Sequence, residues 1–567
     1  MSESASQRHL AFWPPGLPRR LTVPHTNLFY NLEVSARRYP DKPLAIFYDS
    51  PITYGAFFDQ AERLAGWLQA ACGVQHGDRV LLYMQNSPQW MLAYYAILRA
   101  NAVVVPVNPM NLAEEVRHYV TDTGATTIIT AQDLYAQVQP LMAAGLRHVL
   151  VAAYADYLTV PTDLRVPELV AAPREEVAGA GVTLWSSVVA GAYRPGPMTA
   201  GPEDLCAMPY TSGTTGHPKG CMHTHASVMY NALAGVQWFG AQQDAIALSV
   251  LPLFHVTGMQ GGMNGPIFSG ATIVLMARWD RDTAAELIRR HRVNAVQLIT
   301  TMVVDLLSSP RIDDYDLASL TRISGGGAAM PDAIAQKLQA VLGIPYVEGY
   351  GMSETIAPTH INPVHHPKRQ CLGIPIHDVD ARVVDPESFI EVAPGQVGEI
   401  VVHGPQVMRG YWNNPQATDE AFIVIDGKRF LRTGDLACVD EEGFFFMVDR
   451  LKRMINASGY KVWPAEVEAL MYRHPAIREV CVVACFDARR GETVKAVVAL
   501  KEGMAPTAQE IVDWAHANMA AYKCPRIVEF CATLPKSATG KVQWRALEER
   551  APLRQGAGIR SSGSRRW

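Results

Sequence analysis

The pattern of apolar and polar positions is clearest between residues 80 and 130, where short apolar runs alternate with amphipathic stretches. Val80–Met84 and Val103–Val107 are apolar runs typical of buried strands, and Trp90–Leu98 between them predicts a helix. A strand, a helix and a second buried strand form the repeating unit of a parallel sheet with helices on its faces.

A second helix should follow. Asn111 is expected to cap it, Glu114 and Glu115 lie in its first turn, and Gly124 should end it. Thr126–Thr130 then predicts the next strand of the same sheet.

The same alternation recurs in the middle of the chain. A strand, a helix and a strand are predicted at Ala271–Met276, Thr283–Arg290 and Val293–Leu298. Leu320–Ser324 predicts another strand, which runs into Gly325, Gly326 and Gly327 before a helix that begins near Pro331. At such a junction backbone N–H groups can face an anion or a nucleotide.

The last ~110 residues have a different pattern, typical of a small α+β unit. Pro464 can open a helix that continues to Met471, and Val480–Phe486 and Thr493–Leu500 predict strands. Thr507-Ala-Gln-Glu510 is a capping box that predicts a further helix.

The domain boundary is placed near Asp449–Lys452. The predicted division is a Pro- and Arg-rich extension at 1–25, a large domain at 26–449, a mobile domain at 450–552 and a disordered tail at 553–567. The fold class is α/β, with two packed N-terminal subdomains, a distorted β-barrel portion and a small α+β C-terminal domain.

Composition narrows the protein class. The 567 residues are 49% hydrophobic and 18% charged, with a net charge of −4, so no basic field favours nucleic acid. Nine scattered cysteines without a CxxC pair indicate small core residues in a reducing compartment. The N-terminus has no signal-like apolar core, and the stretch Met91–Val105 is too short and polar to span a bilayer. We expect a cytoplasmic protein without a transmembrane segment; a homodimer is left open.

Candidate chemistry is densest between Tyr210 and Gly220, in the run Tyr-Thr-Ser-Gly-Thr-Thr-Gly-His-Pro-Lys-Gly. Glycines let a backbone approach phosphate, hydroxyls donate hydrogen bonds, and Lys219 adds charge. The segment is not a Walker A loop, because its lysine follows a proline rather than preceding Ser or Thr.

Four weaker segments complete the pattern. A carboxylate on a glycine-rich turn suits Mg²⁺ beside phosphate, acidic and basic residues near the boundary can reach ribose hydroxyls, and a lysine lies on a late glycine turn. The segments are Gly349–Thr355, Arg432–Asp435, Asp449–Lys452 and Pro535–Lys541.

In this order the segments closely resemble the adenylate-forming superfamily, which includes acyl-CoA synthetases, peptide synthetase adenylation domains and luciferases. The resemblance covers about residues 25 to 550 and includes the runs Leu251–His255 and Gln406–Pro415. The most similar subgroup is the medium- and long-chain fatty-acyl-CoA synthetases.

The resemblance implies roles for particular residues. Tyr350 should stack on adenine, Asp435 and Arg450 should hold ribose, and Gly326 and Gly327 should line the adenine and acyl side. The complete nucleotide-binding set that it implies is Thr211, Ser212, Gly213, Thr214, Thr215, Gly216, Lys219, Gly326, Gly327, Ala328, Tyr350, Gly351, Ser353, Asp435, Arg450 and Lys452.

The implied catalytic residues are Lys541, Glu354 and His255. Lys541 should drive adenylation, Glu354 should bind Mg²⁺ with Thr211 as a second ligand, and His255 should lie where acyl group and pantetheine meet. Lys452 should be the hinge that turns the C-terminal domain between half-reactions. The expected coenzyme A and acyl channel comprises Gly459, Ser458, Gly258, Met259 and Gly262.

One position departs from the family pattern. Asn456 stands where luciferases and some fatty-acyl relatives carry lysine, so a positive charge is missing and no replacement for it is evident.

The predicted activity is an ATP-dependent carboxylic acid:CoA ligase that uses ATP, Mg²⁺ and coenzyme A. No Arg, Lys or Asp lies among the small and flexible residues that follow His255, which favours an aliphatic chain over a dicarboxylate or an amino acid. The alternative for these residues is ordinary helix packing. The predicted substrate is a medium- or long-chain fatty acid. Aromatic or other organic acids, and transfer of the adenylate to a carrier protein, remain alternatives. A non-enzymatic nucleotide sensor is disfavoured, because Glu354 and Lys541 are both present.

Overall fold

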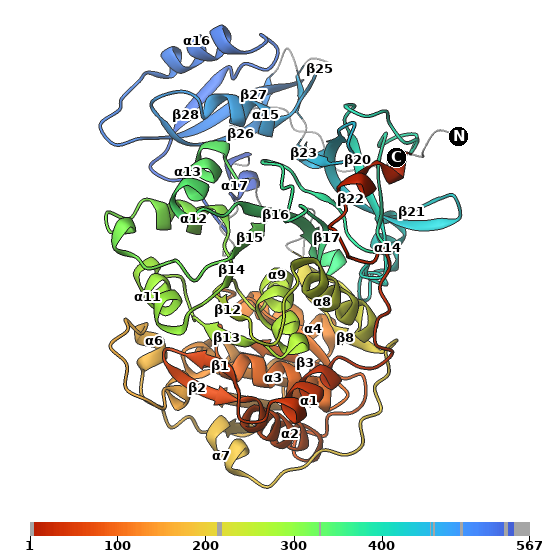
Figure 1. Cartoon of the computed structure of the whole chain (residues 1–567), viewed down its shortest axis with the longest axis vertical. Coiled ribbons are helices and arrows are strands. Elements are labelled where there is room, and N and C mark those ends of the chain that lie inside the picture. The colour runs from red at the N-terminus through yellow and green to blue at the C-terminus, as the bar shows by residue number, and fades with distance from the viewer. Residues whose placement is uncertain are drawn as a thin grey trace, which may run out of the picture.

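The computed structural model describes residues 5–211, 218–327, 330–453, 455–457, 460–487, 491–537 and 542–548. They form a large N-terminal region, built on two mainly parallel sheets and one antiparallel sheet, and a smaller α+β domain at the top of Figure 1. The predicted fold class is therefore confirmed. The tail expected at 553–567 lies outside the described residues.

The first sheet has seven strands in the order β11-β8-β4-β3-β5-β6-β7. Its strands are β3 (Arg79–Tyr83), β4 (Val103–Pro106), β5 (Thr127–Ala131), β6 (His148–Ala152), β7 (Val182–Leu184), β8 (Leu205–Ala207) and β11 (His223–Thr224). The pairs from β8 to β7 are parallel. The predicted alternation is confirmed, with α3 (Pro88–Arg99) and α4 (Ala113–Thr123) as the intervening helices.

The start of α4 differs from the expectation. Asn111 is not its cap: the capping position is Leu112, whose backbone N–H donates to Glu115 Oε2 at 2.8 Å. Because the glutamate satisfies this free donor, the helix begins one residue later than a polar cap at Asn111 would set it. Gly124 ends the helix in the left-handed conformation (φ 64°), as expected.

The second sheet has nine strands in the order β18-β17-β16-β15-β14-β12-β13-β1-β2. They are β1 (Pro43–Phe47), β2 (Ser50–Thr53), β12 (Ile246–Ser249), β13 (Thr272–Leu275), β14 (Ala295–Gln297), β15 (Arg322–Gly326), β16 (Tyr346–Met352), β17 (Ala357–Ile361) and β18 (Ile374–Pro375). One face packs on the apolar sides of α11 (Arg281–His291), α12 (Thr300–Leu307) and α13 (Asp332–Leu342).

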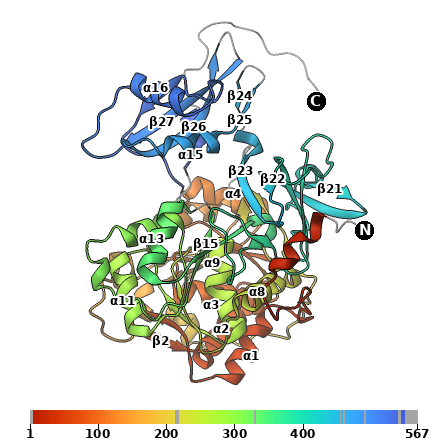
Figure 2. The same cartoon turned by 45° about the horizontal axis from the view of Figure 1, so that its top comes forward.

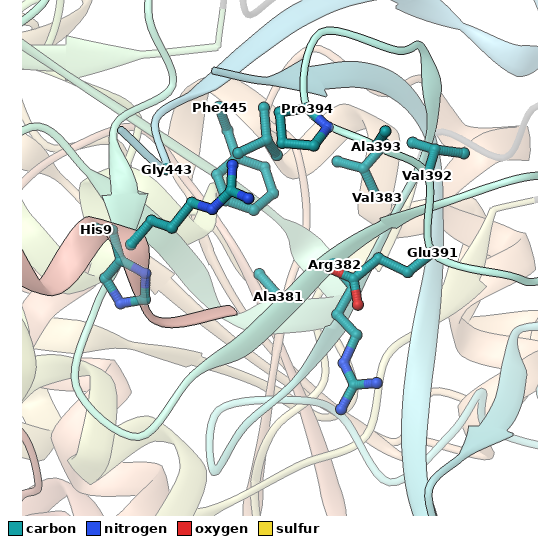
Figure 3. Close-up of a pocket in the computed structure, with 12 residues that line it drawn as sticks. His9, Ala381, Arg382, Val383, Glu391, Val392, Ala393, Pro394, Gly443 and Phe445 are labelled. Carbon is teal, nitrogen blue, oxygen red and sulfur yellow. The ribbon is translucent and has the colours of Figure 1, made fainter. Parts of the chain in front are cut away.

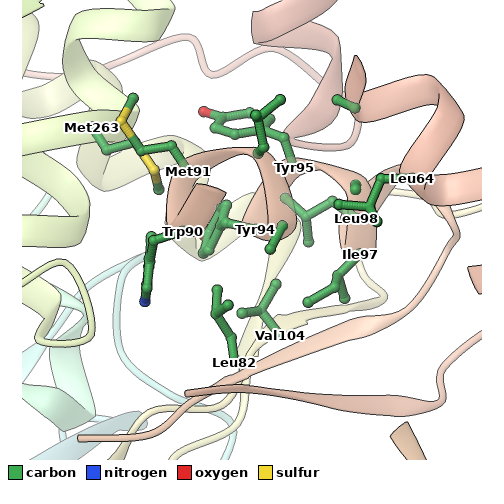
Figure 4. Close-up of a cluster of buried hydrophobic side chains, with 14 of the residues drawn as sticks. Leu64, Leu82, Trp90, Met91, Tyr94, Tyr95, Ile97, Leu98, Val104 and Met263 are labelled. Carbon is green, nitrogen blue, oxygen red and sulfur yellow. The ribbon is translucent and has the colours of Figure 1, made fainter. Parts of the chain in front are cut away.

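Helices join the two sheets in one core. Side chains of α1 (Phe29–Arg38), α2 (Tyr54–Ala70) and α3 share a cluster with residues of β3 and β4 in the first sheet and of β1 and β13 in the second. Every residue of α3 from Pro88 to Leu98 is buried, including Trp90 and Tyr94 (Figure 4). A helix that is apolar all round belongs between two layers rather than on a surface.

The third sheet is antiparallel and has five strands among the described residues; the barrel portion that the sequence suggested stays a prediction. The sheet comprises β19 (Asp380–Val384), β20 (Gly398–His403), β21 (Phe422–Ile425), β22 (Lys428–Val439) and β23 (Phe445–Arg450). Strand β22 pairs with three of the others and ends the N-terminal region beside β23.

The C-terminal domain follows directly. Its sheet contains β24 (Ile455–Ala457), β25 (Tyr460–Val462), β26 (Ile477–Asp487), β27 (Gly491–Leu500) and β28 (Ile527–Phe530), with α15 (Pro464–Met471), α16 (Ala508–Asn518) and α17 (Trp544–Glu548) (Figure 2). The predicted bounds of α15 are confirmed, and Thr507 and Glu510 form the predicted capping box.

The N-terminal extension packs on the body of the protein. Arg8 pairs with Glu441 at 2.9 Å, and the Trp13 ring lies 5.2 Å from that of Trp238. His9 borders a small pocket between this segment and β19 (Figure 3), where burial, aided by Arg19, lowers the pKa of the imidazole to about 4. No residue expected in the active site lines this pocket.

The remaining elements are short connectors or cover the sheets. They are α5 (Tyr135–Val138), α6 (Glu168–Ala171), α7 (Trp185–Ala190), α8 (His225–Phe239), α9 (Val256–Met259), α10 (Gly265–Ser269), α14 (Pro415–Glu420), β9 (Tyr210–Thr211), β10 (Lys219–Gly220), the π-helical turn η5 (Gln260–Asn264) and the 3-10 turns η1 (Ala5–Phe12), η2 (Gln132–Leu134), η3 (Gln139–Ala144), η4 (Tyr154–Tyr157), η6 (Ile312–Asp314), η7 (Ser353–Thr355) and η8 (Leu451–Arg453). Among the described helices none is both long and apolar enough to cross a bilayer.

The central helix α3 makes a direct test of this packing possible. Leu98→Ala should destabilise the N-terminal region by about 2–5 kcal/mol, because the cavity left between the layers cannot collapse fully. Urea unfolding followed by tryptophan fluorescence measures the change. Val424→Ala, at a side chain that is 73% exposed, is the control and should change stability by less than about 0.5 kcal/mol. An equal shift in the two variants would contradict the packing described here.

Candidate active site

The base of the expected phosphate loop is a two-stranded hairpin. Strands β9 and β10 pair so that Thr211 is opposite Lys219 and Tyr210 is opposite Gly220. The hairpin brings Lys219 back beside Thr211, as a loop wrapped around phosphate requires. The intervening candidates lie outside the described residues: Ser212, Gly213, Thr214, Thr215 and Gly216.

A second segment, residues 406–412, hydrogen-bonds to the backbone beside this hairpin. Trp412 N–H donates to Gly220 O at 2.8 Å, and Cys221 forms a β-bridge with Tyr411. Sequence analysis noted this run only as part of the resemblance and gave it no role. The two segments are about 190 residues apart in the chain, so no local pattern reveals their contact.

Tyr411 connects the lysine of the hairpin with the expected magnesium ligand. Its hydroxyl donates to Glu354 Oε1 at 2.8 Å, and Lys219 Nζ lies 4.1 Å from the centroid of its ring. Burial raises the pKa of Glu354, and the Tyr411 hydrogen bond and the charge of Lys219 partly oppose that rise. The result is a carboxylate withdrawn from water beside a cation.

The donor set around Glu354 fits Mg²⁺. The ion takes oxygen ligands and usually keeps one or two carboxylates together with substrate phosphates. Glu354 supplies one such carboxylate close to Lys219, and no cluster of three His, Cys, Asp or Glu side chains able to hold an ion exists among the described residues. Glu354 is thus suited to hold an ion that ATP phosphates also ligate.

The glycines that precede Glu354 lie in an extended strand, not in the tight glycine turn that was expected, and Glu354 lies in the short turn after that strand. Strand β16 continues through Gly349, Tyr350 and Gly351 to Met352, and the single turn η7 follows. A Cβ on Gly351 would lie 2.2 Å from Ala357 O, so the glycine is needed for close strand approach. Ser353 contributes its carbonyl oxygen, which accepts from His223 Nε2 at 2.7 Å.

The polar residues expected to hold the nucleoside come from three strands, with Tyr350 on β16, Asp435 on β22 and Arg450 on β23. The Tyr350 hydroxyl donates to Asp435 Oδ2 at 2.7 Å, and Arg450 Nε lies 3.2 Å from Asp435 Oδ1. Asp435 and Arg450 are directly opposite in the β22–β23 ladder. Thus the structure brings all three predicted residues together, with Asp435 buried, Tyr350 partly buried and Arg450 exposed.

Glu399, which sequence analysis did not identify, shapes the segment that carries Asp435. Its buried carboxylate accepts from Arg432 Nη2 at 2.8 Å and from Gly434 N–H at 3.0 Å. Gly434 has φ 69°, a conformation that glycine adopts without strain. A lone glutamate in a strand gives no sequence signal of this role.

The glycine run at the end of β15 also requires small residues. A Cβ on Gly326 would lie 2.2 Å from Gly349 O, and Gly327 has φ 87°. The run therefore allows β15 and β16 to approach closely at the edge where Tyr350 lies. Ala328 falls outside the described residues.

His255 is the N-cap of α9. Its Nδ1 accepts from Thr257 N–H at 3.4 Å, and the side chain is partly exposed. Of the expected acyl-channel residues, Gly258 packs against backbone: a Cβ there would lie 2.2 Å from Pro252 O. Met259 is fully buried in the core, and a Cβ on Gly262 would lie 2.5 Å from Ser249 Oγ. These three residues pack tightly against their neighbours, as in ordinary helix packing.

The domain boundary has its own polar contacts. Strand β23 ends at Arg450 and Lys452 lies in η8, whereas Asp449 Oδ2 accepts from Ala465 N–H of α15 at 2.7 Å. Burial raises the pKa of Asp449, an effect opposed by Arg453, which also binds Glu468. The Lys452 side chain and residues Ser458, Gly459 and Lys541 lie outside the described part.

Comparison with known proteins is consistent with this geometry. The profile of the AMP-binding enzyme family matches residues 32–412, and that of the AMP-binding enzyme C-terminal domain matches residues 466–541. The chain therefore belongs to the AMP-binding enzyme family, and the resemblance to the adenylate-forming superfamily is confirmed.

Individual relatives extend over nearly the whole chain. A long-chain-fatty-acid–CoA ligase of Bacillus subtilis (strain 168) is 35% identical over 553 residues, which cover 95% of this chain and 97% of the relative. A feruloyl-CoA synthase of Amycolatopsis is 33% identical over 511 residues, or 89% and 95%. ATP-bound MatB from Rhodopseudomonas palustris has a similar structure, with a TM-score of 0.80, 27% identity and coverage of 92% and 98%.

The position of Asp435 predicts that its replacement weakens the use of ATP more than the use of the acid. Asp435→Ala should raise KM for ATP by about 10- to 100-fold with little change in KM for the acid, because hydrogen bonds to a charged acceptor contribute about 1.5–3 kcal/mol. Steady-state kinetics with each substrate varied measures this. Asp419→Ala, at an exposed position on α14, is the control. A raised acid KM with unchanged ATP KM would remove Asp435 from the nucleoside site.

A buried glutamate beside the site predicts a pH effect. Glu348 of β16 accepts from Gln370 N–H at 3.1 Å and from Met330 N–H at 3.4 Å, and burial raises its pKa from 4.5 to about 7. Between those pH values the folded protein holds a proton that the unfolded chain has lost, so this group makes stability fall as pH rises.

The Glu348→Gln variant should therefore lack this pH dependence of stability. From pH 4.5 to pH 7.5 the unfolding free energy of the wild type should fall by about 2–3 kcal/mol relative to that of the variant. Urea unfolding at several pH values measures it. A difference that is constant across this range would contradict the raised pKa.

Proposed function

We propose that the protein activates a carboxylic acid with ATP, releases pyrophosphate to give an acyl-adenylate, and transfers the acyl group to coenzyme A. It is an AMP-forming acid–thiol ligase in this proposal. The observation that carries it is the position of two residue sets on one stretch of chain: Tyr350 faces the Asp435–Arg450 pair, and Glu354, four residues later, faces Tyr411 and Lys219.

The arrangement suits attack of a carboxylate on the α-phosphate. An anion attacks a polyanion, so positive charge is needed where negative charge develops. Lys219 lies at the phosphate-loop base, Glu354 and Thr211 would hold Mg²⁺, and Lys541 would be supplied by the C-terminal domain. When bound, the ion would neutralise phosphate charge.

The second half-reaction needs a thiol in space that pyrophosphate and Lys541 occupied. Rotation of the C-terminal domain about Lys452 would withdraw Lys541 and present Ser458 and Gly459 to the pantetheine arm. His255, at the start of α9, would position the acyl group rather than act as an obligatory base, because a thiol has a pKa near ~8.5 and AMP is a good leaving group.

For the acid, we propose a medium- or long-chain fatty acid. The similarity to long-chain-fatty-acid–CoA ligases across nearly the full chain supports it. An aromatic acid is the second candidate, because a feruloyl-CoA synthase and structures of benzoate and anthranilate CoA ligases are also similar. ATP-dependent AMP formation with acids from acetate to palmitate, and with benzoate and cinnamate, decides between them.

Half-reaction assays test the two-step mechanism. Lys541→Ala should lose acid-dependent ATP–pyrophosphate exchange by about 100-fold or more, because a charge felt mainly in the transition state is removed. Given preformed acyl-adenylate and coenzyme A, it should form thioester at a near-normal rate. Gly459→Leu should show the reverse pattern, since its side chain would fill the pantetheine path. Equal damage to both steps in Lys541→Ala, or exchange that requires coenzyme A, would contradict the proposal.

A further inference from the structure

Three polar residues form a row across the second sheet. Gln297 of β14 is opposite Ser324 of β15, and on its other side Ser249 of β12 follows the register pair Leu248–Val296 and so is level with Gln297. The three strands are parallel neighbours, so these side chains point to the same face at the carboxyl ends of the strands.

The row faces away from the apolar helix layer. Leu248, Val296 and Ile323, the residues that directly precede the three polar ones, pack with α11, α12 and α13. Since side chains alternate along a strand, the row lies on the opposite face, under η5. A Cβ on Gly261 would lie 2.1 Å from Gln297 Oε1, which places that amide against the helix turn.

Three oxygen atoms in this row lack a hydrogen-bond partner. Ser249 and Ser324 are only 2% and 3% exposed, and their hydroxyl oxygens, like the buried Gln297 Oε1, contact no donor or acceptor within the described residues. A buried polar atom left unpaired costs about 1–3 kcal/mol, so three adjacent ones amount to an unusual concentration of polarity.

The row adjoins the proposed reaction centre. Ser324 immediately precedes the Gly325–Gly327 run, and the η5 turn that covers Gln297 and Ser249 continues from α9, which begins after His255. In open α/β sheets ligands bind at the carboxyl ends of the strands. The row is therefore at the sheet edge where the acyl chain of an adenylate held near Gly326 would lie, and its three strands are neighbours about 4.8 Å apart.

Resting on the proposed function, we infer that the acid carries a hydroxyl group that hydrogen-bonds to Gln297 and to the Ser249 and Ser324 hydroxyls. Gln297 Oε1 accepts a hydrogen bond from that hydroxyl, and either serine can donate a hydrogen bond to the hydroxyl oxygen. The shared chemistry is a hydroxylated carboxylic acid, whether its hydroxyl is on an aliphatic chain or on an aromatic ring. A site built this way discriminates against an acid without the hydroxyl, because its own polar atoms are then left unpaired.

The test compares matched acids. Wild-type enzyme is assayed for acid-dependent AMP formation with octanoate against hydroxyoctanoates substituted at successive carbons, and with cinnamate against 4-hydroxycinnamate. In at least one series kcat/KM should favour a hydroxylated member by about tenfold or more. The series that shows the preference identifies the aliphatic or the aromatic source.

Gln297→Leu replaces the acceptor with an apolar side chain of similar size. It should abolish that preference and raise kcat/KM for the unsubstituted acid, which also shows that the variant is folded. Gln339→Leu, the same substitution at an exposed position of α13, is the control and should retain the wild-type ratio. If Gln297→Leu is not obtained as folded protein, Ser249→Ala and Ser324→Ala should each reduce the preference.

The outcomes separate the two proposals. Use of the unsubstituted acids with no hydroxyl preference in either series overturns this inference and leaves the ligase function standing. A preference that survives unchanged in the Gln297 and serine variants overturns it as well. The absence of acid-dependent AMP formation with every acid refutes the proposed function itself.

Discussion

The geometry of the candidate active site depends on how one carboxylate is held out of water. Glu354 is buried, and a buried carboxylate persists as an anion only if hydrogen bonds and nearby charge compensate for lost hydration. Here Tyr411 supplies the hydrogen bond and Lys219 supplies the charge across the tyrosine ring. Tyr411 therefore links the β9–β10 hairpin, which carries Lys219, to Glu354 in the turn that follows β16.

The backbone reinforces the same connection. Met408 N–H donates to Glu354 O at 2.8 Å, and further along residues 406–412 the chain bonds to Gly220 and Met222 beside the hairpin. One segment therefore fixes Glu354 through main chain and side chain and also fixes the base of the loop. Small residues at Gly326 and Gly351 allow β15, β16 and β17 to approach closely, which keeps Tyr350 and Glu354 on one edge. Preorganisation of this kind lets charge act on phosphate without rearrangement during the reaction.

The sequence predicted the parallel sheets well, because strands buried on both faces are continuous apolar runs such as Val103–Val107. Helix α15 was predicted to the residue, since Pro464 restricts where it begins. The cap at Asn111 was wrong because Leu112 is the capping residue, and Glu115 reaches back from inside the helix to accept from its N–H. Motif residues such as Asp435 were identifiable by resemblance, whereas Tyr411 and Glu399 were not, because their roles depend on partners 57 and 33 residues away. Three-dimensional contacts of this range leave no periodicity to detect.

The boundary contacts constrain how the C-terminal domain could turn. Asp449 precedes Lys452 and Ala465 follows it, so the hydrogen bond between them spans the expected hinge. A rotation confined to Lys452 would move α15 relative to β23 and break that bond. The freed Asp449 carboxylate, buried and close to Arg453, would then need a new donor or access to water, since an uncompensated buried charge is costly. A rotation that begins before Asp449 would instead carry the bond intact with the C-terminal domain. That pivot, however, would disturb the pairing of Asp449 and Arg450 with β22 and the ion pair between Arg450 and Asp435. Rotation at either position therefore breaks contacts that the present arrangement makes, and rotation at Lys452 leaves the β22–β23 ladder intact.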